Sequence, residues 1–402
     1  MDVEAFYDRY PYPPPLRDLE RYRQRWKPAE RRRAEFHLLW PAREYRDSFS
    51  ILIAGCGTSQ AAKYAIRWPA ARVTGVDFSA AGIRHTEQLK RKYRLDNLEL
   101  RQLPLERLGE LDDRFELIVC TGVLHHLPDP DAGLRTLRSV LEPQGAMQLM
   151  VYAPYGRRGI YMLQEFCRRV GFVAPEGDVS ELVAALEALP TDHPVASLLR
   201  ETPDFRNEAA VADALLHPHD RAYSVPELLE FLRGNGLTFG RWLRQAPYSL
   251  RAGLMSRLPA TLRSARLSVE EESAAAELFR GSMMRHSVIA YRDDESGTPG
   301  IRFDGTAWLD YVPIRMNDTL TVREGMPPGI EAILVNRAHA HRDICLPVRP
   351  GELRLLEAID GTRSIRDILS AETALESARS LFERLWLHDQ VVFDASQVRD
   401  TR

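Results

Sequence analysis

The chain has 402 residues, of which 44% are hydrophobic and 28% charged, so it has the composition of a folded globular protein and not of a disordered or fibrous one. A total of 54 lysines and arginines against 57 aspartates and glutamates gives a net charge of −3, which excludes an overall basic field of the kind that binds nucleic acid or anionic membranes. The length predicts two or three domains, no apolar run is long enough to predict a membrane span, and four isolated cysteines predict reduced thiols in the cytoplasm and no zinc site.

The N-terminal region, residues 1–48, is predicted to be an extended arm followed by a helix. The proline density of F-Y-D-R-Y-P-Y-P-P-P (Phe6–Pro15) excludes a helix or a central strand. From Arg17 to Arg46 basic residues outnumber acidic ones, and aromatic and leucine residues interrupt them, so one face of this helix-prone segment can pack.

Residues 49–292 are predicted to form a Rossmann-like, doubly wound α/β domain, because short apolar runs alternate there with helical ones. The runs that predict strands are 51–54, 72–76, 98–101, 117–120, 146–151, 237–243 and 286–291. A helical stretch at about 159–218 interrupts this alternation before the sixth strand. The sequence therefore predicts a seven-stranded sheet with a helical insertion.

A polar, turn-rich segment at 293–300 predicts a domain boundary. Beyond it, residues 301–395 contain two strand-like runs, three short helical segments and a closing strand at 390–393. Helices followed by a short β element predict a small α+β domain of the winged-helix kind.

The strongest functional signal is a glycine turn after the first strand. In I-L-I-A-G-C-G-T (Ile51–Thr58) the two glycines allow the backbone to approach a ligand closely. The second strand ends at Asp77, whose carboxylate is placed to accept both hydroxyls of a ribose. Dinucleotide-binding folds have a third glycine where this chain has Gln60, so the pattern favours a cofactor without phosphates.

With these residues in this order, the chain resembles the class I S-adenosylmethionine-dependent methyltransferases, closely over residues 50–155 and loosely up to 292. L-I-V-C-T-G-V-L-H-H-L (Leu117–Leu127) is similar to the family's fourth strand and the loop after it. L-E-P-Q-G (Leu141–Gly145) is similar to the turn before its fifth strand. The resemblance implies a methyltransferase with S-adenosylmethionine as its cofactor.

The resemblance also implies which residues bind that cofactor. They are Gly55, Cys56, Gly57 and Thr58 in the glycine turn, Asp77 and Phe78 at the ribose, Leu103 and Leu105 at the adenine through their backbone, and Thr121 and Gly122 beside the methionine end. The family usually has an acid after the third strand, whereas here the nearest one is Glu106.

Four further residues are candidates for catalysis. His125 and His126 follow the fourth strand, where they can act as acid and base, aim a nucleophile, or pack. Tyr10 and Tyr12 lie on the proline-rich arm, which can fold over the cofactor as a lid or pack against the sheet edge. Methyl transfer from a sulfonium mainly needs a positioned nucleophile, so no catalytic triad is expected.

The methyl acceptor is predicted to be a protein or peptide side chain, because the C-terminal region resembles the winged-helix domains attached to protein- and peptide-modifying enzymes. DNA is not expected, since the fourth strand leads into T-G-V-L-H-H and not a P-P-Y-type loop, and no Pro-Cys pair occurs. One alternative is a small-molecule methyltransferase with the 159–218 helices as a cap. Another is a non-catalytic scaffold that binds S-adenosylmethionine. The sequence assigns no oligomeric state.

Overall fold

The computed structural model describes residues 13–172, 179–196, 199, 207–263, 267–294, 300–370 and 373–398. The chain divides into two compact units. The first contains residues 1–25, 48–237 and 281–286, and the second contains residues 26–47, 238–280 and 287–402. The second unit thus contains residues from both sides of the predicted boundary at 293–300. The two compact units therefore differ in their residue ranges from the predicted domains.

The central element is a seven-stranded sheet in the order β3-β2-β1-β4-β5-β7-β6. Its strands are β1 (Ser50–Ala54), β2 (Arg72–Asp77), β3 (Leu98–Gln102), β4 (Phe115–Thr121), β5 (Leu141–Tyr152), β6 (Leu237–Trp242) and β7 (Arg285–Arg292). Strands β1 to β5 pair in parallel. The apolar runs of β1 and β4 are fully buried, as expected for parallel strands covered on both faces. The predicted seven-stranded Rossmann-like fold is confirmed.

The strand order reverses between β1 and β4. From β1 the chain proceeds outward through β2 to β3, and then returns to place β4 on the other side of β1. Right-handed crossovers put the connecting helices on opposite faces of the sheet on either side of this point, which leaves a crevice beyond the carboxyl ends of the strands. The helices of these crossovers are α4 (Gln60–Arg67), α5 (Ala80–Tyr93) and α6 (Pro130–Ser139), and the 3-10 turns are η1 (Leu105–Leu111) and η2 (Leu124–His126).

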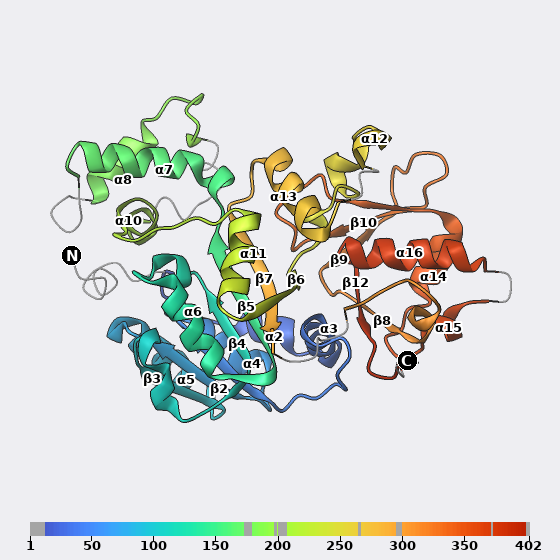
Figure 1. Ribbon diagram of the computed structural model, residues 1–402, viewed down its shortest axis with the longest axis horizontal. Coiled ribbons are helices and arrows are strands. Elements are labelled where there is room, and N and C mark those ends of the chain that lie inside the picture. The colour runs from blue at the N-terminus through green and yellow to red at the C-terminus, as the bar shows by residue number, and fades with distance from the viewer. Residues whose placement is uncertain are drawn as a thin grey trace. The chain divides into compact units, whose positions relative to one another are not determined.

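The helical insertion begins at α7 (Pro154–Arg169), directly after β5 and five residues before the predicted start. Pro154 suits this position, because the first turn of a helix needs no N–H donor there. The helices α7, α8 (Val179–Glu187) and α10 (Glu208–Leu216) lie together in Figure 1. They share a small separate core in which Ile160, Leu182 and Val211 are buried. The chain returns to the sheet through α11 (Val225–Gly234).

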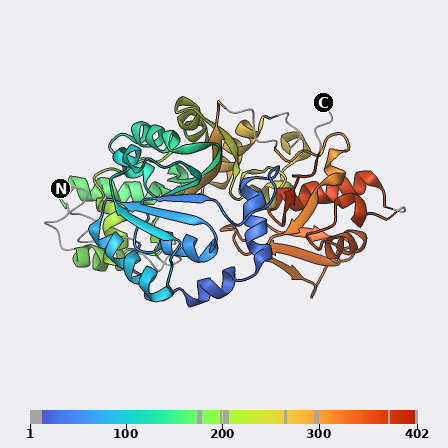
Figure 2. The same ribbon diagram turned by 90° about the horizontal axis from the view of Figure 1, so that it is seen from below.

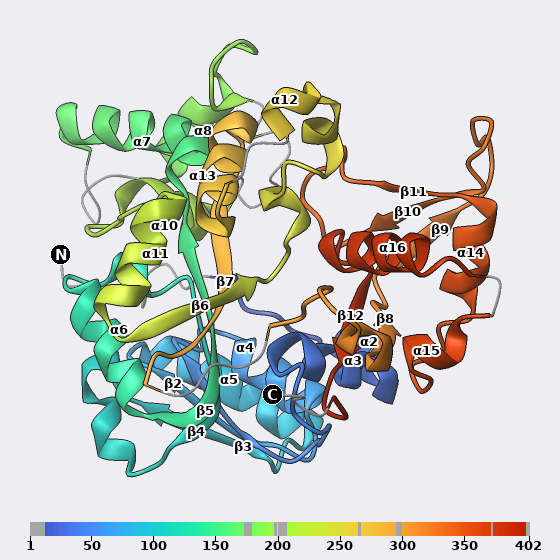
Figure 3. The ribbon, with the colours of Figure 1, turned by 45° about the vertical axis from the view of Figure 1, so that its right-hand side comes forward.

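The second unit has its own apolar core (Figure 3). Its strands are β8 (Val312–Arg315), β9 (Thr319–Val322), β10 (Ala332–Asn336), β11 (Leu346–Val348) and β12 (Val391–Asp394), and its helices α12 (Ala260–Arg263), α13 (Val269–Arg280), α14 (Pro350–Glu357), α15 (Ile365–Ile368) and α16 (Leu375–Leu387). Figure 3 shows α16 among these elements. Its Leu381 and Leu385 are buried in one cluster with Leu334 of β10.

The order of helices and strands agrees with the predicted winged-helix arrangement, but the strand pairing expected for its wing is different. Strand β12 follows the three helices as expected, yet it pairs with β8, which precedes them. The sequence did not predict β8 or β9, because V-P-I-R and T-L-T-V are only four residues long and adjoin polar turns. The three-stranded sheet β11-β10-β9 also lies before the helices.

The charged N-terminal stretch forms two helices, α2 (Glu20–Trp26) and α3 (Ala29–Leu39), separated at Pro28. In the second unit α3 lies beside β8 and β12 (Figure 2). Arg33 of α3 forms an ion pair of 2.9 Å with Asp394, and the Tyr291 hydroxyl donates to the carbonyl of Leu39. This helix is therefore part of the second unit and not of the arm.

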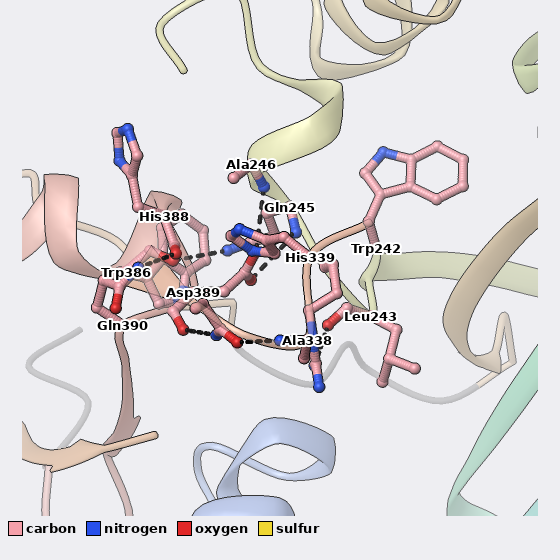
Figure 4. A network of polar contacts seen from close by, with 12 residues as sticks. Trp242, Leu243, Gln245, Ala246, Ala338, His339, Trp386, His388, Asp389 and Gln390 are labelled. Carbon is pink, nitrogen blue, oxygen red and sulfur yellow. Dashed lines mark hydrogen bonds and ion pairs between the residues drawn. The ribbon is translucent and has the colours of Figure 1, made fainter. Parts of the chain in front are cut away.

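Asp389 is the centre of a buried polar network in the second unit (Figure 4). Its carboxylate accepts hydrogen bonds from the backbone N–H groups of Gln245 and Ala246 and contacts His339 Nε2 at 2.9 Å and Arg241 at 3.3 Å. Burial would raise the pKa of this carboxyl, but the hydrogen bond and charge of His339 and the charges of Arg241 and Arg244 outweigh that and lower it. The network joins segments 241–246, 336–339 and 386–390.

Replacing Asp389 by Ala is expected to destabilise the second unit by about 3–5 kcal/mol, because Arg241 is left buried without its counter-charge. The measurement is urea unfolding followed by tryptophan fluorescence, since five of the six tryptophans belong to this unit. The matched control is Asp310→Ala, which removes a half-exposed ion pair to Arg366 and should cost less than about 1 kcal/mol. Equal costs for the two variants would contradict the role given to Asp389.

Candidate functional site

The glycine turn after β1 has the backbone that its sequence predicts. Gly55 has φ +71° and Gly57 has φ +52°, in the left-handed region that side chains disfavour. A Cβ atom at Gly55 would lie 2.2 Å from Cγ2 of Val123. At Gly55 the close approach therefore comes from the chain itself.

Asp77 holds this turn against the end of β2. Its Oδ2 accepts from the N–H of Gly57 at 2.7 Å, and its Oδ1 accepts from the N–H of Ser79 at 2.9 Å. Burial raises the pKa of the Asp77 carboxyl, and the two backbone hydrogen bonds compensate only in part. The two hydrogen bonds therefore do not fully offset the free energy of burying this carboxyl group. Each of its oxygens has a second lone pair, which is suited to accept a further hydrogen bond from a ligand.

Two side-chain contacts connect the turn to its surroundings. The Thr58 hydroxyl, 2% exposed, donates to the carbonyl of Pro13 at 2.8 Å. The side-chain amide of Gln60 donates to the Thr121 hydroxyl at 2.7 Å. The first contact brings the end of the arm to the glycine turn, and the second crosses from the start of α4 to the end of β4.

The residues expected at the ribose and adenine lie next to Asp77. The N–H of Leu103 donates to the carbonyl of Asp77, so only the carbonyl of Leu103 is available to a ligand. The carbonyl of Phe78 accepts from Gln102, and Leu105 is buried at the start of η1. Cys56 is also buried, so it contributes its backbone and not its thiol, whose pKa burial raises.

His125 and His126 are both buried and stack in a cluster of rings. The His125 ring lies 3.9 Å from that of Tyr152 and 4.2 Å from that of His126, which in turn lies 4.0 Å from His217. Within the described part of the chain, neither nitrogen of His125 has a hydrogen-bond partner. Burial, with smaller contributions from the charges of His126, Arg157 and His217, holds the pKa of His125 well below its usual range. His125 is therefore a neutral imidazole with a free donor and a free acceptor.

His126 is fixed by the segment that follows the insertion. Its Nδ1 lies 2.8 Å from the carbonyl of His219, and since a carbonyl can only accept, Nδ1 carries the hydrogen. Its Nε2 then faces Asp213 of α10 at 4.0 Å, and the Tyr152 hydroxyl approaches the same carboxylate at 3.4 Å. The insertion thus contributes a carboxylate to the cluster.

Arg157 is the positively charged residue beside this cluster of rings. Its guanidinium lies 3.5 Å from the centre of the Tyr152 ring and forms a buried ion pair of 3.3 Å with Asp220. Asp220 also accepts from Gln164 at 2.7 Å. The charge of Arg157 is therefore neutralised by Asp220, and its guanidinium packs against the ring of Tyr152.

Sequence reasoning did not assign Asp213, His217 or Asp220 to this site. Asp213 had a usable signal, since it is the one acid inside the apolar stretch A-A-V-A-D-A-L-L of α10. Asp220 lies in a loop with no pattern that points to Arg157. The predicted lid residues Tyr10 and Tyr12 lie outside the described residues.

Among the residues that the structure describes, no group of three or more His, Cys, Asp or Glu is placed to hold a metal ion. In the same part of the chain no helix has the length and apolarity needed to cross a membrane.

Comparison with known proteins places this site in a methyltransferase domain. Residues 52–147, from β1 to β5, match the family model described as "Methyltransferase domain". An uncharacterized protein of Synechococcus sp. is 32% identical over 250 residues, which are 59% of this chain and 58% of the relative. A ubiquinone biosynthesis O-methyltransferase of Alkalilimnicola ehrlichii is 32% identical over 99 residues, which are 24% of this chain and 38% of the relative. The matches thus span less than two thirds of these relatives.

Among solved structures, PKMT2 from Rickettsia typhi in complex with AdoHcy superposes with a TM-score of 0.60 at 15% identity. The match covers 92% of this chain and 75% of PKMT2, so the shared fold extends beyond the methyltransferase domain. The predicted resemblance to methyltransferases is confirmed for residues 52–147.

His217 makes the first unit sensitive to acid. Burial, with a smaller contribution from the charge of His126, lowers the pKa of His217 to about 3. The unfolded chain binds this proton near pH 6.5, so stability is full above that pH and falls as the pH drops below it. Lowering the pH from 7 to 5 should cost about 2 kcal/mol through His217 alone.

The variant His217→Asn is expected to remove that loss, because its amide oxygen can still accept from the N–H of His219, as Nδ1 of His217 does at 3.0 Å. The measurement is urea unfolding followed by circular dichroism at pH 7 and pH 5. His85→Asn on α5 is the control and should keep the wild-type loss. A loss in His217→Asn as large as in the wild type would show that His217 is not the responsible group.

Proposed function

We propose that this protein is an S-adenosylmethionine-dependent methyltransferase. One observation carries the proposal: the Gly57 turn and the Asp77 carboxylate meet where the strand order reverses, within a matched methyltransferase domain. The solved neighbour PKMT2 was obtained with AdoHcy, the demethylated form of that cofactor, which supports the choice.

The residues at this edge of the sheet fit such a cofactor. The free lone pairs of the buried Asp77 suit two ribose hydroxyls, and the carbonyl of Leu103 suits the adenine amino group. The left-handed backbone of Gly57, which has no side chain, suits close approach of a ligand to the turn. When bound, S-adenosylmethionine supplies an electrophilic methyl group on a sulfonium.

The chain's own contribution to transfer is to position the acceptor and exclude water. His125 offers a free donor and a free acceptor in a neutral ring, and Tyr152 and His126 keep that ring in place. A neutral imidazole can orient an attacking nitrogen or oxygen through a hydrogen bond, while the lowered pKa of His125 makes the ring a weak base. We assign that role to His125 and assign to His126, held by the carbonyl of His219, the role of supporting it.

We propose a protein side chain as the acceptor. The second unit has a core of its own and is not needed to complete the cofactor site, so its surface is available for recognising a macromolecule. The match of PKMT2 to 92% of the chain supports treating that unit as part of one functional fold.

A small-molecule acceptor is the second candidate. The buried cluster of His125, His126, Tyr152 and Asp213 lies under the insertion, as an enclosed small acceptor would require. The relatives named ubiquinone biosynthesis O-methyltransferase support this alternative over the 99 residues that match.

The Asp77→Ala variant is expected to bind S-adenosylhomocysteine at least about tenfold more weakly than the wild type, because it loses charge-assisted hydrogen bonds to the ribose. Isothermal titration calorimetry measures this. Asp113→Ala, which removes an exposed ion pair to Arg72 in the same unit, is the control and should bind normally. Unchanged affinity in a folded Asp77→Ala protein would remove Asp77 from the site.

Incubation of the full chain with methyl-labelled S-adenosylmethionine is expected to transfer label to protein. A lysate of the source organism is first dialysed, and the retained macromolecules and the small molecules are offered separately. Protease-sensitive label should form only with the macromolecules, and Asp77→Ala should reduce it. Label formed only with the small molecules would favour the second candidate. Cofactor binding without any transfer would indicate a scaffold.

A further inference from the structure

The ring of Tyr152, the last residue of β5, lies between a guanidinium and an imidazole. The guanidinium carbon of Arg157 is 3.5 Å from the ring centre, and the centre of the His125 ring is 3.9 Å from it. At these distances neither group can lie beside the ring in its plane, and the two cannot share one face without overlapping. Arg157 of α7 and His125 of η2 therefore occupy opposite faces of Tyr152.

His125 depends on this stack for the direction of its side chain. Its backbone is fixed, because its carbonyl accepts from the N–H of Arg221 at 3.0 Å. A histidine that orients a ligand with one ring nitrogen is commonly fixed by a hydrogen bond from the other. Neither ring nitrogen of the buried His125 has such a partner among the described residues. Contact with the rings of Tyr152 and His126 therefore sets where these nitrogens point.

Arg157 is well fixed for holding the other face of the tyrosine ring. It is buried, and its Nη2 lies 3.3 Å from Oδ2 of Asp220. Its Nε donates to the Tyr161 hydroxyl at 3.2 Å. A planar guanidinium can stack on an aromatic face, whereas an ammonium group is a compact, hydrated point charge. The planar group of Arg157, and not its charge alone, thus suits the contact with Tyr152.

We propose that Arg157 is a positioning residue for the methyl acceptor, because it holds the ring of Tyr152 against His125 and so fixes the direction of the imidazole that orients the acceptor. The proposal rests on the function proposed above. Arg157 acts through the tyrosine ring and needs no contact with the acceptor. Behind burial and the charge of His126, the charge of Arg157 also lowers the pKa of His125, which keeps the oriented imidazole neutral.

A merely structural role for Arg157 predicts something different. If the arginine only neutralised Asp220, any cation in its place would serve. Arg157→Lys keeps a positive charge for Asp220, so the insertion should still fold, but it removes the planar group that stacks on Tyr152. The matched control is Arg158→Lys, because Arg158 is the next residue of the same helix and is exposed.

The first measurement needs no ligand. It is NMR of the full chain labelled with ¹³C in the histidine rings, with the His125 signal assigned by its absence in His125→Asn. The ring current of Tyr152 should place this signal upfield of an unstacked histidine. Arg157→Lys should move it downfield, and Arg158→Lys should leave it in place. An unchanged His125 signal in Arg157→Lys would overturn the proposal.

The second measurement is transfer of label from S-adenosylmethionine into the fraction of the lysate that the wild type labels. Arg157→Lys should slow this transfer roughly tenfold to hundredfold, as for a misplaced reacting group. Its calorimetric affinity for S-adenosylhomocysteine should stay within about twofold of the wild type. Tyr152→Leu removes the ring, so adding Arg157→Lys to it should cause no further loss.

A loss from Arg157→Lys that is equally large with and without the Tyr152 ring would show that the arginine does not act through it. Unchanged transfer, or a loss that weaker cofactor binding accounts for, would equally overturn the proposal. A wild-type protein that transfers no label to either fraction would instead contradict the function proposed above, whatever the histidine spectrum shows.

Discussion

The hydrogen bond from the N–H of Gly57 to the carboxylate of Asp77 joins the first strand's turn to the second strand's end, and the candidate site depends on it. It joins a glycine with a positive φ to a buried carboxyl group. Burial raises the pKa of Asp77, so the folded protein bears a cost there that further hydrogen bonds to the carboxylate would offset. Such a carboxylate is better explained by ligand binding than by stability.

The cluster around His125 and His126 depends on contacts with the helical insertion and the segment after it. The helical insertion contributes Asp213 to His126, and the segment after it contributes the carbonyl of His219 and the Asp220 partner of Arg157. These contacts hold Tyr152 and leave the neutral His125 with unused hydrogen-bonding capacity. The insertion thus shapes the reaction side of the sheet as well as covering it.

Much of this could be predicted from the sequence, because parallel strands are apolar throughout and glycine turns have a local backbone requirement. The strands of the sheet, the turn at Gly57 and the position of Asp77 follow from such local patterns. The contacts of Asp213 and Asp220 could not be predicted, since they depend on how the insertion folds back over β5. The strands β8 and β9 were missed for a related reason: four-residue strands take their conformation from their partners. The composition of the second unit, with α3 against β12, likewise depends on contacts between distant segments such as Arg33 with Asp394.

The central claim is that a nucleoside cofactor with an amino-acid end binds across the carboxyl ends of β1, β2 and β4. The most direct test is a crystal structure of the full chain with S-adenosylhomocysteine. The account predicts the ribose hydroxyls on the Asp77 carboxylate and the amino-acid end beside Thr121 at the end of β4. A nucleoside bound at another edge of the sheet, with Asp77 contacting only Gly57 and Ser79, would contradict it.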